Sequence, residues 1–337
     1  MLGPVLATAG IVWGPSPKTT RAGGGARTHL YARAVRQLRL SPRAYQRITL
    51  AAVVALVAII VTGAAVRLTG SGLGCSDWPT CENDRLVAPL EYHAMVEFVN
   101  RTITGLVSIA VILAVLGALV RVPRRRDLTW LSLGLVAGMV GQIVLGGLTV
   151  LFELRPPFVI AHFVLSLVLV WNALVLHRRA GTDGSRPLPV VAAPVRRLAR
   201  ALVVAACAVV LSGTIVTGTG PHGGDEHVTR LGFDLESVAR VHSLTAWVLL
   251  ALTIVTLVAM HRLGAPIEVV RIARALVVVL VAQGAIGYIQ YFTGVPPWLV
   301  LAHVAGSAAV FVTVVWFDLA LVARPLEGHG VEHAVGS

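Results

Sequence analysis

Three histidines occur in long apolar runs of the sequence, where an ionisable side chain is costly and by default marks function. His162 and His303 each lie a few residues into such a run, and His242 stands at the start of another. At about 1.5 Å per helical residue, His162 and His303 lie roughly 8 to 9 Å from the nearer end. Because the three stand at one depth, we predict that they are metal ligands rather than isolated polar residues.

The pattern of these histidines favours haem over zinc. Imidazoles that face each other from neighbouring helices of a four-helix bundle can serve as a pair of axial haem ligands. Zinc needs three or four ligands close together, with Cys or carboxylate among them. The sequence therefore predicts a bis-His haem between His242 and His303. His162 is the counterpart of His303 in the first half of the chain, where Asn100 takes the place of His242 and one ligand is missing.

A carboxylate lies one helical turn from Asn100. His93, Glu97 and Asn100 are spaced i, i+4 and i+7, which places them on one helical face. Glu97 is the candidate catalytic acid–base or charge-stabilising group, with a solvated interfacial side chain as the alternative. His93 is a candidate second ligand or proton relay.

Two cysteines and three arginines flank these positions. Cys75 and Cys81 enclose five residues, a spacing that allows a small disulfide-closed loop, acting either as a structural clamp or as a redox-active pair. Arg67, Arg101 and Arg240 stand at the ends of the apolar runs. Their guanidinium groups are candidates for ion pairs with haem propionates, with interfacial anchoring as the alternative.

Transmembrane helices are the elements that must position these residues. Of the 337 residues, 56% are hydrophobic and 13% are charged, which excludes a soluble globular enzyme. The apolar runs are also too long for the strands of a β-barrel. Roughly 20 apolar residues cross the hydrocarbon layer, and eight runs of about that size are found at 48–66, 102–120, 128–152, 156–176, 201–220, 241–260, 275–295 and 296–317. The predicted fold is therefore all-α and integral to the membrane.

The eight spans form two similar sets of four. Gln142 precedes His162 by twenty residues, and Gln283 precedes His303 by the same twenty. The tripeptide Val-Thr-Gly at 61–63 also recurs at 216–218. These matches predict two repeated four-helix bundles of parallel topology. The predicted organisation is a poorly ordered basic tail (1–46), an N-terminal bundle (47–177), a cytoplasmic linker (178–200), a C-terminal bundle (201–323) and a C-terminal tail (324–337).

The basic residues predict the orientation in the membrane. Of 28 Lys and Arg residues, 22 fall in the N-terminal segment, in 121–126, 178–200 and 262–274, or at Arg324. Basic loops stay in the cytoplasm, so both termini are predicted inside and the histidines near the outer face. This distribution also excludes a nucleic-acid-binding face, despite the net charge of +12. We expect a bacterial cell membrane protein; if 1–46 is instead a transit peptide, the mitochondrial inner membrane is the alternative.

Taken together, the motifs resemble those of the haem A synthase family over about residues 45–323. The resemblance rests on Arg67-Leu-Thr-Gly-Ser-Gly-Leu-Gly-Cys75-Ser-Asp-Trp78-Pro79-Thr-Cys81, on Glu97-Phe-Val-Asn100-Arg101, on Gly146-Gly147-Leu-Thr-Val-Leu before His162-Phe, on Arg240-Val-His242, and on the Pro-Pro element before His303. One position departs from the commonest form of the family, which has His where this chain has Asn100.

The resemblance implies an oxidoreductase that oxidises the C8 methyl group of haem O to a formyl group, giving haem A for cytochrome oxidase assembly. It implies a haem B cofactor between His242 and His303 in the C-terminal bundle. The N-terminal bundle would take the substrate haem on His162, with Glu97 essential.

The same resemblance matches Cys75 and Cys81 to a cysteine pair in the first outer loop of the family. Asn100 leaves two arrangements open for the substrate iron: His162 binds it alone, or His93 contributes the second ligand. An open position would suit oxygen activation at the iron.

Three other functions fit part of the pattern. A two-haem electron-transfer protein of the cytochrome b type predicts two equivalent bis-His sites, which Asn100 disfavours. A quinone-linked thiol oxidoreductase has no need of three intramembrane histidines, and a transporter would place them nearer the midplane. The expected partners are a haem O synthase as substrate donor, a membrane electron donor or acceptor such as quinone, the lipid bilayer and a second copy in a homo-oligomer.

Overall fold

The computed structural model describes residues 39–81, 87–182 and 184–323. They form eight long helices, α2 (Pro42–Leu68), α3 (Tyr92–Val120), α4 (Arg126–Leu151), α5 (Pro156–Ala180), α6 (Ala193–Thr219), α7 (Leu235–Arg262), α8 (Ile267–Phe292) and α9 (Pro297–Ala320). Two short strands, β1 (Leu188–Pro189) and β2 (Val322–Ala323), pair antiparallel. The predicted C-terminal tail and most of the predicted N-terminal tail lie outside the described residues.

All eight helices are long and apolar enough to cross a membrane, which confirms the predicted all-α membrane fold. Six of them start earlier than the predicted apolar runs, and α2 and α3 show why. α2 begins at Pro42, inside the segment predicted as tail, and the Ser41 hydroxyl caps it by accepting a bond from the Ala44 N–H. α3 begins at Tyr92 rather than at residue 102, because Glu97 and Arg101 form an ion pair within the helix and so need not end it.

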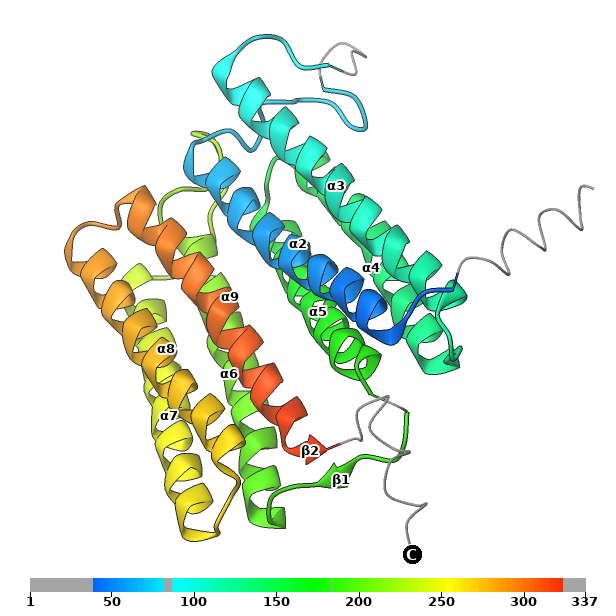
Figure 1. Cartoon of the computed structure of the whole chain (residues 1–337). Helices are drawn as coiled ribbons and strands as arrows, with labels where there is room; N and C mark the ends of the chain where they lie inside the picture. The colour runs from blue at the N-terminus through cyan, green and yellow to red at the C-terminus, as the bar shows by residue number, and fades with distance from the viewer. Residues whose placement is uncertain (1–38, 82–86, 183, 324–337) are drawn as a thin grey trace, which may run out of the picture. The chain divides into compact units, whose positions relative to one another are not determined.

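Each set of four helices closes into a ring. In the first ring α2 and α4 both pack against α3 and α5, and α6 to α9 repeat this pattern in the second ring (Figure 1). Phe311 and Val315 of α9 pack into the core of the first ring, while Val310 and Phe317 of the same helix pack into the core of the second. α9 is therefore the helix that joins the two cores.

The buried positions repeat from one ring to the other. Leu167 of α5 corresponds to Ala308 of α9, a difference of 141 in residue number, which we call the step. The buried residues of α5 from Leu169 to Leu176 recur in α9 at the same step. All four buried residues of α7 match buried residues of α3 at a step of 142, as Leu249 matches Val107. The register of α3 and α7 places Asn100 where the second ring has His242.

In α2 and α6 the register differs from the prediction. Buried residues of α2 recur in α6 at a step of 150, as Leu56 and Ala206 do. Thr62 therefore corresponds to Ser212, and each hydroxyl donates to the carbonyl three residues earlier. The predicted match of 61–63 with 216–218 is out of register by five residues.

Loop length explains the change of step. The loop from α2 to α3 spans 69–91, whereas the loop from α6 to α7 spans 220–234, which is eight residues shorter. A step of 150 before this loop thus becomes 142 after it. The additional length lies in the loop that carries Cys75 and Cys81.

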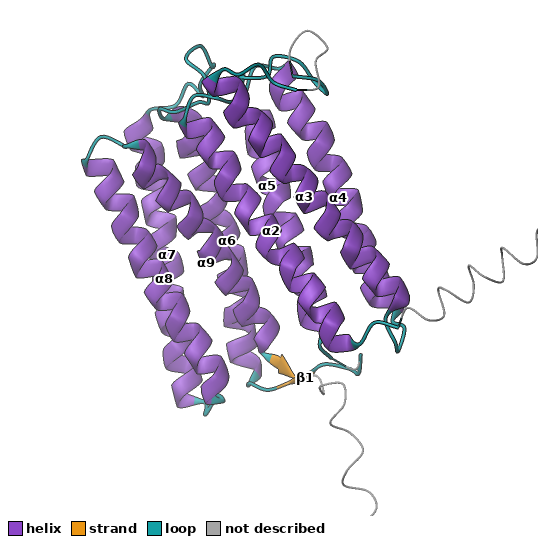
Figure 2. Ribbon diagram, turned by 45° about the horizontal axis from the view of Figure 1, so that its top comes forward, coloured by secondary structure: helices purple, strands orange, loops and turns teal. Residues whose placement is uncertain are grey.

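The loops that begin at residues 69, 152, 220 and 293 lie at one end of the helices, which we call the disulfide end (Figure 2). Two hydrogen bonds join loops there. The Gly72 N–H donates to the Gly224 carbonyl at 2.8 Å and so connects the two rings. His222 contacts the Val295 carbonyl through Nε2, also at 2.8 Å.

At the opposite end, Tyr45 of α2 is fully buried and donates from its hydroxyl to the Ala114 carbonyl of α3 at 3.1 Å. We expect Tyr45→Phe to lower the free energy of unfolding by about 1 kcal/mol, since the bond is lost inside a packed interface. The midpoint of thermal unfolding in detergent measures this. Tyr92→Phe, at an exposed site, is the matched control, and equal midpoints for the two variants would contradict the assigned role of Tyr45.

Candidate functional site

Two of the three predicted ligands face each other in the second ring. The ring centroids of His242 on α7 and His303 on α9 are 6.2 Å apart, and the planes make an angle of 76°. Two imidazoles on opposite sides of one metal ion, each with a bond of about 2 Å, would have centroids roughly this far apart. Within the described ranges no three His, Cys, Asp or Glu side chains converge on a common point, as a zinc site would need.

Hydrogen bonds orient one of the two imidazoles, that of His242. His242 Nδ1 bonds to the Ser212 hydroxyl at 3.0 Å, and Ser212 also contacts the Thr245 hydroxyl at 3.0 Å. Holding Nδ1 in this way presents Nε2 as the nitrogen for a metal. His303 Nδ1 is buried without a hydrogen-bond partner in the described part of the chain. The residues present thus fit a metal-containing group bound between the two imidazoles.

The twenty-residue spacing from Gln to His, which occurs once in each half of the chain, has a structural cause. Gln283 Nε2 donates to the His303 backbone carbonyl at 2.8 Å, and Gln142 Nε2 donates to that of His162 at 3.1 Å. Each glutamine therefore fastens its helix to the next one at the level of the histidine. A glycine at position 287 leaves room for this histidine, because a Cβ at Gly287 would lie 3.0 Å from His303 Cε1.

In the first ring, the position that would supply a second imidazole beside His162 is occupied by an amide. Asn100 occupies the position of His242, and its Oδ1 is buried with no partner among the described residues. His162 Nδ1 is likewise buried and unpartnered there. A groove of about 380 Å³ between α2 and α3 is lined by Thr62, Asn100 and apolar side chains. The first ring thus joins an unpaired imidazole with an apolar groove.

His93, the candidate second ligand, contacts the loop. Its Nδ1 bonds to the Ser71 hydroxyl at 3.0 Å, and the residue is exposed. Tyr92 lies edge-on against its ring. The structure therefore brings His93 to the loop that follows α2.

Glu97 holds the same loop. The side chain is buried, with 6% of the residue exposed. Its Oε2 accepts from the Cys75 N–H at 2.8 Å, and its Oε1 accepts from Arg101 Nη2 at 2.6 Å and Nε at 3.1 Å. Both carboxylate oxygens are thus engaged.

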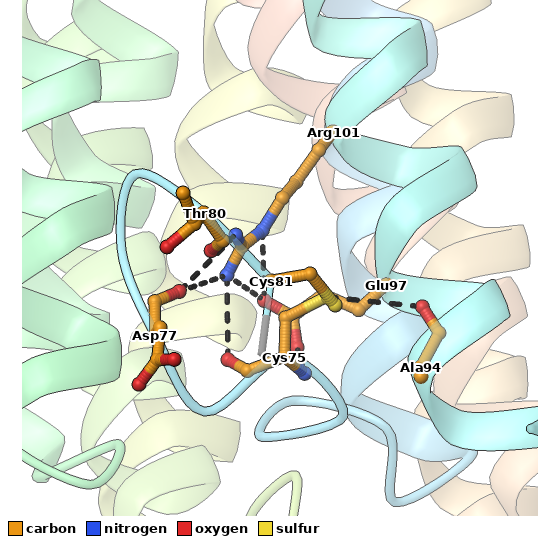
Figure 3. A network of polar contacts seen from close by, with 7 residues as sticks. All are labelled: Cys75, Asp77, Thr80, Cys81, Ala94, Glu97 and Arg101. Atoms are coloured by element: carbon orange, nitrogen blue, oxygen red, sulfur yellow. Dashed lines mark hydrogen bonds and ion pairs between the residues drawn. A yellow bond between two sulfur atoms is a disulfide. The ribbon is translucent and has the colours of Figure 1, made fainter. Parts of the chain in front are cut away.

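Arg101 extends this contact along the loop (Figure 3). Its Nη1 donates to the Thr80 carbonyl at 2.8 Å, and further bonds of 3.3 to 3.4 Å reach the carbonyls of Asp77 and Cys75. Cys75 and Cys81 form a buried disulfide with an S–S length of 2.04 Å. We call Glu97, Arg101, Cys75 and Cys81 the loop clamp. The sequence singled out all four residues but not their mutual contact, for which the i, i+4 spacing of Glu97 and Arg101 was the available sign.

The loop also covers α4 close to His162. A Cβ at Gly147 would lie 2.9 Å from the Trp78 ring, so the indole rests directly on the helix backbone. A Cβ on the neighbouring Gly146 would lie 3.5 Å from His162 Cε1. Trp78, which sequence reasoning quoted only as part of a motif, therefore connects the disulfide loop to the helix that touches the unpaired histidine.

The other two predicted propionate partners differ in their surroundings. Arg240 is exposed and pairs with Glu236 one turn away on α7. Arg67 is partly buried in the last turn of α2, and its side chain makes no hydrogen bond to any described residue.

Comparison with known proteins adds a second kind of observation. A sequence model of the cytochrome oxidase assembly protein family (COX15-CtaA) matches residues 46–93 and 87–222. A protein of Exiguobacterium sibiricum named "Heme A synthase" is 27% identical over 167 residues, which cover 48% of this chain and 55% of that protein. A protein of Lysinibacillus sphaericus with the same name is 30% identical over 128 residues, covering 37% and 41%. The chain therefore spans about half the length of the curated relatives it matches.

The loop clamp predicts how easily the disulfide is reduced. Arg101→Ala removes the bonds to three loop carbonyls, so we expect a water-soluble reductant to open Cys75–Cys81 at least about tenfold faster than in the unaltered protein. Alkylation of the freed thiols, followed by mass spectrometry, measures the rate. Arg240→Ala removes an exposed ion pair on α7 and is the control. Equal rates in the two variants would show that Arg101 does not protect the disulfide.

Proposed function

The chain belongs to the cytochrome oxidase assembly protein family, and we propose that it is a haem A synthase, which oxidises the C8 methyl group of haem O to the formyl group of haem A. One observation carries the proposal: His242 and His303 face each other in one ring, whereas in the other ring Asn100 stands at the position that matches His242 and His162 Nδ1 is unpartnered among the described residues. Such asymmetry suits one resident haem and one haem that is substrate. The relatives named "Heme A synthase" support the same activity.

The second ring is the proposed site of a resident haem B, with His242 and His303 as axial ligands. Ser212 fixes the His242 ring through Nδ1, and Gln283 fixes the backbone of His303. A haem bound there supplies one-electron transfer. His242 and His303 would hold this group, with the His242 imidazole oriented by Ser212.

The first ring is the proposed site of haem O, with His162 as its protein ligand. Asn100 leaves the opposite side without an imidazole, and His93 is engaged by Ser71. The groove between α2 and α3 is apolar and open, which suits lateral entry of an isoprenoid-bearing substrate from the bilayer. In net terms, forming the aldehyde from the methyl group takes up one water and releases four electrons and four protons, which the quinone proposed below as electron partner would accept.

Glu97 is the proposed catalytic group, one turn from Asn100 on α3. Its oxygens are held by Arg101 and the Cys75 N–H, so its carboxylate has a fixed position from which to accept a proton or stabilise developing positive charge. The loop clamp makes this position depend on the disulfide. We therefore assign Cys75 and Cys81 a structural role in holding Glu97.

The chain is a multi-pass membrane protein with bacterial relatives. We propose that both termini are cytoplasmic, as the basic loops indicate, so that the disulfide end faces the oxidising side of the membrane. A haem O synthase as donor, a quinone as electron partner and self-association belong to the same proposal.

Pigment extraction from protein made in cells that supply haem O tests the function. We expect haem B together with haem O or haem A from the unaltered protein. In Glu97→Gln we expect haem O to stay bound and haem A to fall at least about tenfold, since a neutral amide neither accepts a proton nor offsets positive charge. Chromatography of the extracted haems gives both amounts.

Glu236→Gln, which breaks an exposed ion pair on α7, is the matched control and should leave haem A unchanged. Normal haem A in Glu97→Gln would remove the catalytic role of Glu97. Haem B alone, at two per chain, would instead support a two-haem electron carrier of the cytochrome b type.

The two rings should also differ in which haem they retain. We expect His303→Ala to lose haem B, because one of its two axial ligands is gone, whereas His162→Ala retains haem B and loses haem O. Haem content per chain and the reduced absorption spectrum measure this after purification. Retention of haem B in His303→Ala together with its loss in His162→Ala would reverse the assignment of the rings.

A further inference from the structure

Two arginines from different rings lie together at the disulfide end. Arg67 is in the last turn of α2, and Arg230 lies in the loop 220–234. Two adjacent glycines of that loop contact them: a Cβ on Gly224 would lie 3.4 Å from Arg67 Cγ, and a Cβ on Gly223 would lie 2.8 Å from Arg230 Nη1. The positive charge of Arg230 is near enough to act on Arg67. Two like charges are thus held beside one glycine pair.

Neither guanidinium has a hydrogen bond or ion pair with any residue that the structure describes, and both are partly buried. The carboxylate of Asp225, in the same loop, accepts instead from the His227 N–H at 3.1 Å. Burial lowers the pKa of Arg230. Two such cations in proximity oppose folding unless an anion joins them.

The loop that carries Arg230 is fastened to its surroundings. The Gly224 carbonyl accepts from Gly72 of the first ring at 2.8 Å, and the Leu231 N–H donates to the Gly218 carbonyl of α6 at 2.9 Å. Gly224 has a φ of 106°, which favours glycine at this point. These contacts fix the loop on both sides of Arg230, so the two cations form a prearranged site.

We propose that Arg67 and Arg230 bind a carboxylate of a bound porphyrin, a haem propionate, between the two rings. The occupant rests on the proposed function, which places porphyrins beneath this end. His162 and His303 each lie six residues from the first residue of their helix, roughly 9 Å from the disulfide end. A porphyrin held there with its acidic edge toward the loops directs its carboxylates to the level of the arginines, and a guanidinium matches a carboxylate with two parallel N–H donors.

This site changes the set of arginines assigned to propionates. Arg101 is committed to Glu97 and the loop carbonyls, and Arg240 pairs with Glu236 at the surface. Arg230, which the sequence did not single out, takes their place. A cation from each ring means that the bound carboxylate also links the two halves of the chain.

Titration of the full-length protein in detergent with haem O and with haem O dimethyl ester tests the site. The ester keeps the macrocycle and the isoprenoid chain but masks both carboxylates. We expect the unaltered protein to bind the free acid about tenfold more tightly than the ester. Arg230→Gln should remove this preference and leave the affinity for the ester unchanged, whereas Arg240→Gln keeps the preference.

The source of the carboxylate is decided by the same variants. If it belongs to haem O, Arg230→Gln loses the preference for the free acid and purifies with a full complement of haem B. If it belongs to haem B, Arg230→Gln purifies with less haem B while the preference for free haem O persists. Full haem B with an unchanged preference in both Arg230→Gln and Arg67→Gln overturns the proposal.

Charge reversal provides a variant that does not depend on Arg67→Gln folding. A glutamate in Arg230→Glu would pair with Arg67, so we expect a higher midpoint of thermal unfolding together with loss of the carboxylate contact; a lower midpoint with that contact retained contradicts the site. Failure of the function is distinguishable. A protein that prefers the free acid but makes no haem A overturns the synthase assignment alone.

Discussion

The hydrocarbon interior of a membrane offers no hydrogen bonds, and the polar contacts within the spans follow from that constraint. Hydroxyl groups within the spans bond to the carbonyls of their own helix, as Ser108, Thr149 and Thr253 do. Larger polar groups gather near one end of the helices and satisfy one another. His242 bonds to a serine of the next helix, and Glu97 bonds to an arginine and a loop N–H. The chemistry of the protein is therefore concentrated where polar side chains can reach partners.

The two rings share one arrangement of helices but carry different residues at matching positions. The second ring holds His242 with the Ser212 hydroxyl, and a short loop closes it. In the first ring Thr62 retains a hydroxyl at the matching position but faces an amide, and a longer loop lies over the helices. The protein thus supplies both sides of one site and only one side of the other. A cofactor that stays and a substrate that must leave place these different demands on a site.

Much of this frame could be predicted from the chain alone. Long apolar runs gave the eight helices. The twenty-residue interval from Gln142 to His162, which recurs from Gln283 to His303, revealed the repeat. The same hydrogen bond from Gln to the His backbone carbonyl occurs in each half and maintains the interval. The apolar run at 102–120 left out the first turns of α3, because Glu97 and Arg101 look too polar for a span until their ion pair is seen. The spacing of His93, Glu97 and Asn100 nevertheless placed these residues on one helical face. Contacts to backbone carbonyls, such as those of Arg101, leave no residue pattern, since every residue has a carbonyl. The pairing of Arg67 with Arg230 depends on how two loops meet, which no spacing encodes.

Within each pair of matching helices, the buried residues differ by a constant number. This pattern describes a four-helix unit that was duplicated in tandem and then diverged. Four crossings return a chain to the side from which it started, so a fused second copy inserts with the orientation of the first. A unit of three or five helices would have placed its copy upside down, with the two histidine sites facing opposite compartments. The even number allowed both sites to remain under loops on one face, where an insertion of eight residues could alter one copy without disturbing the packing of either.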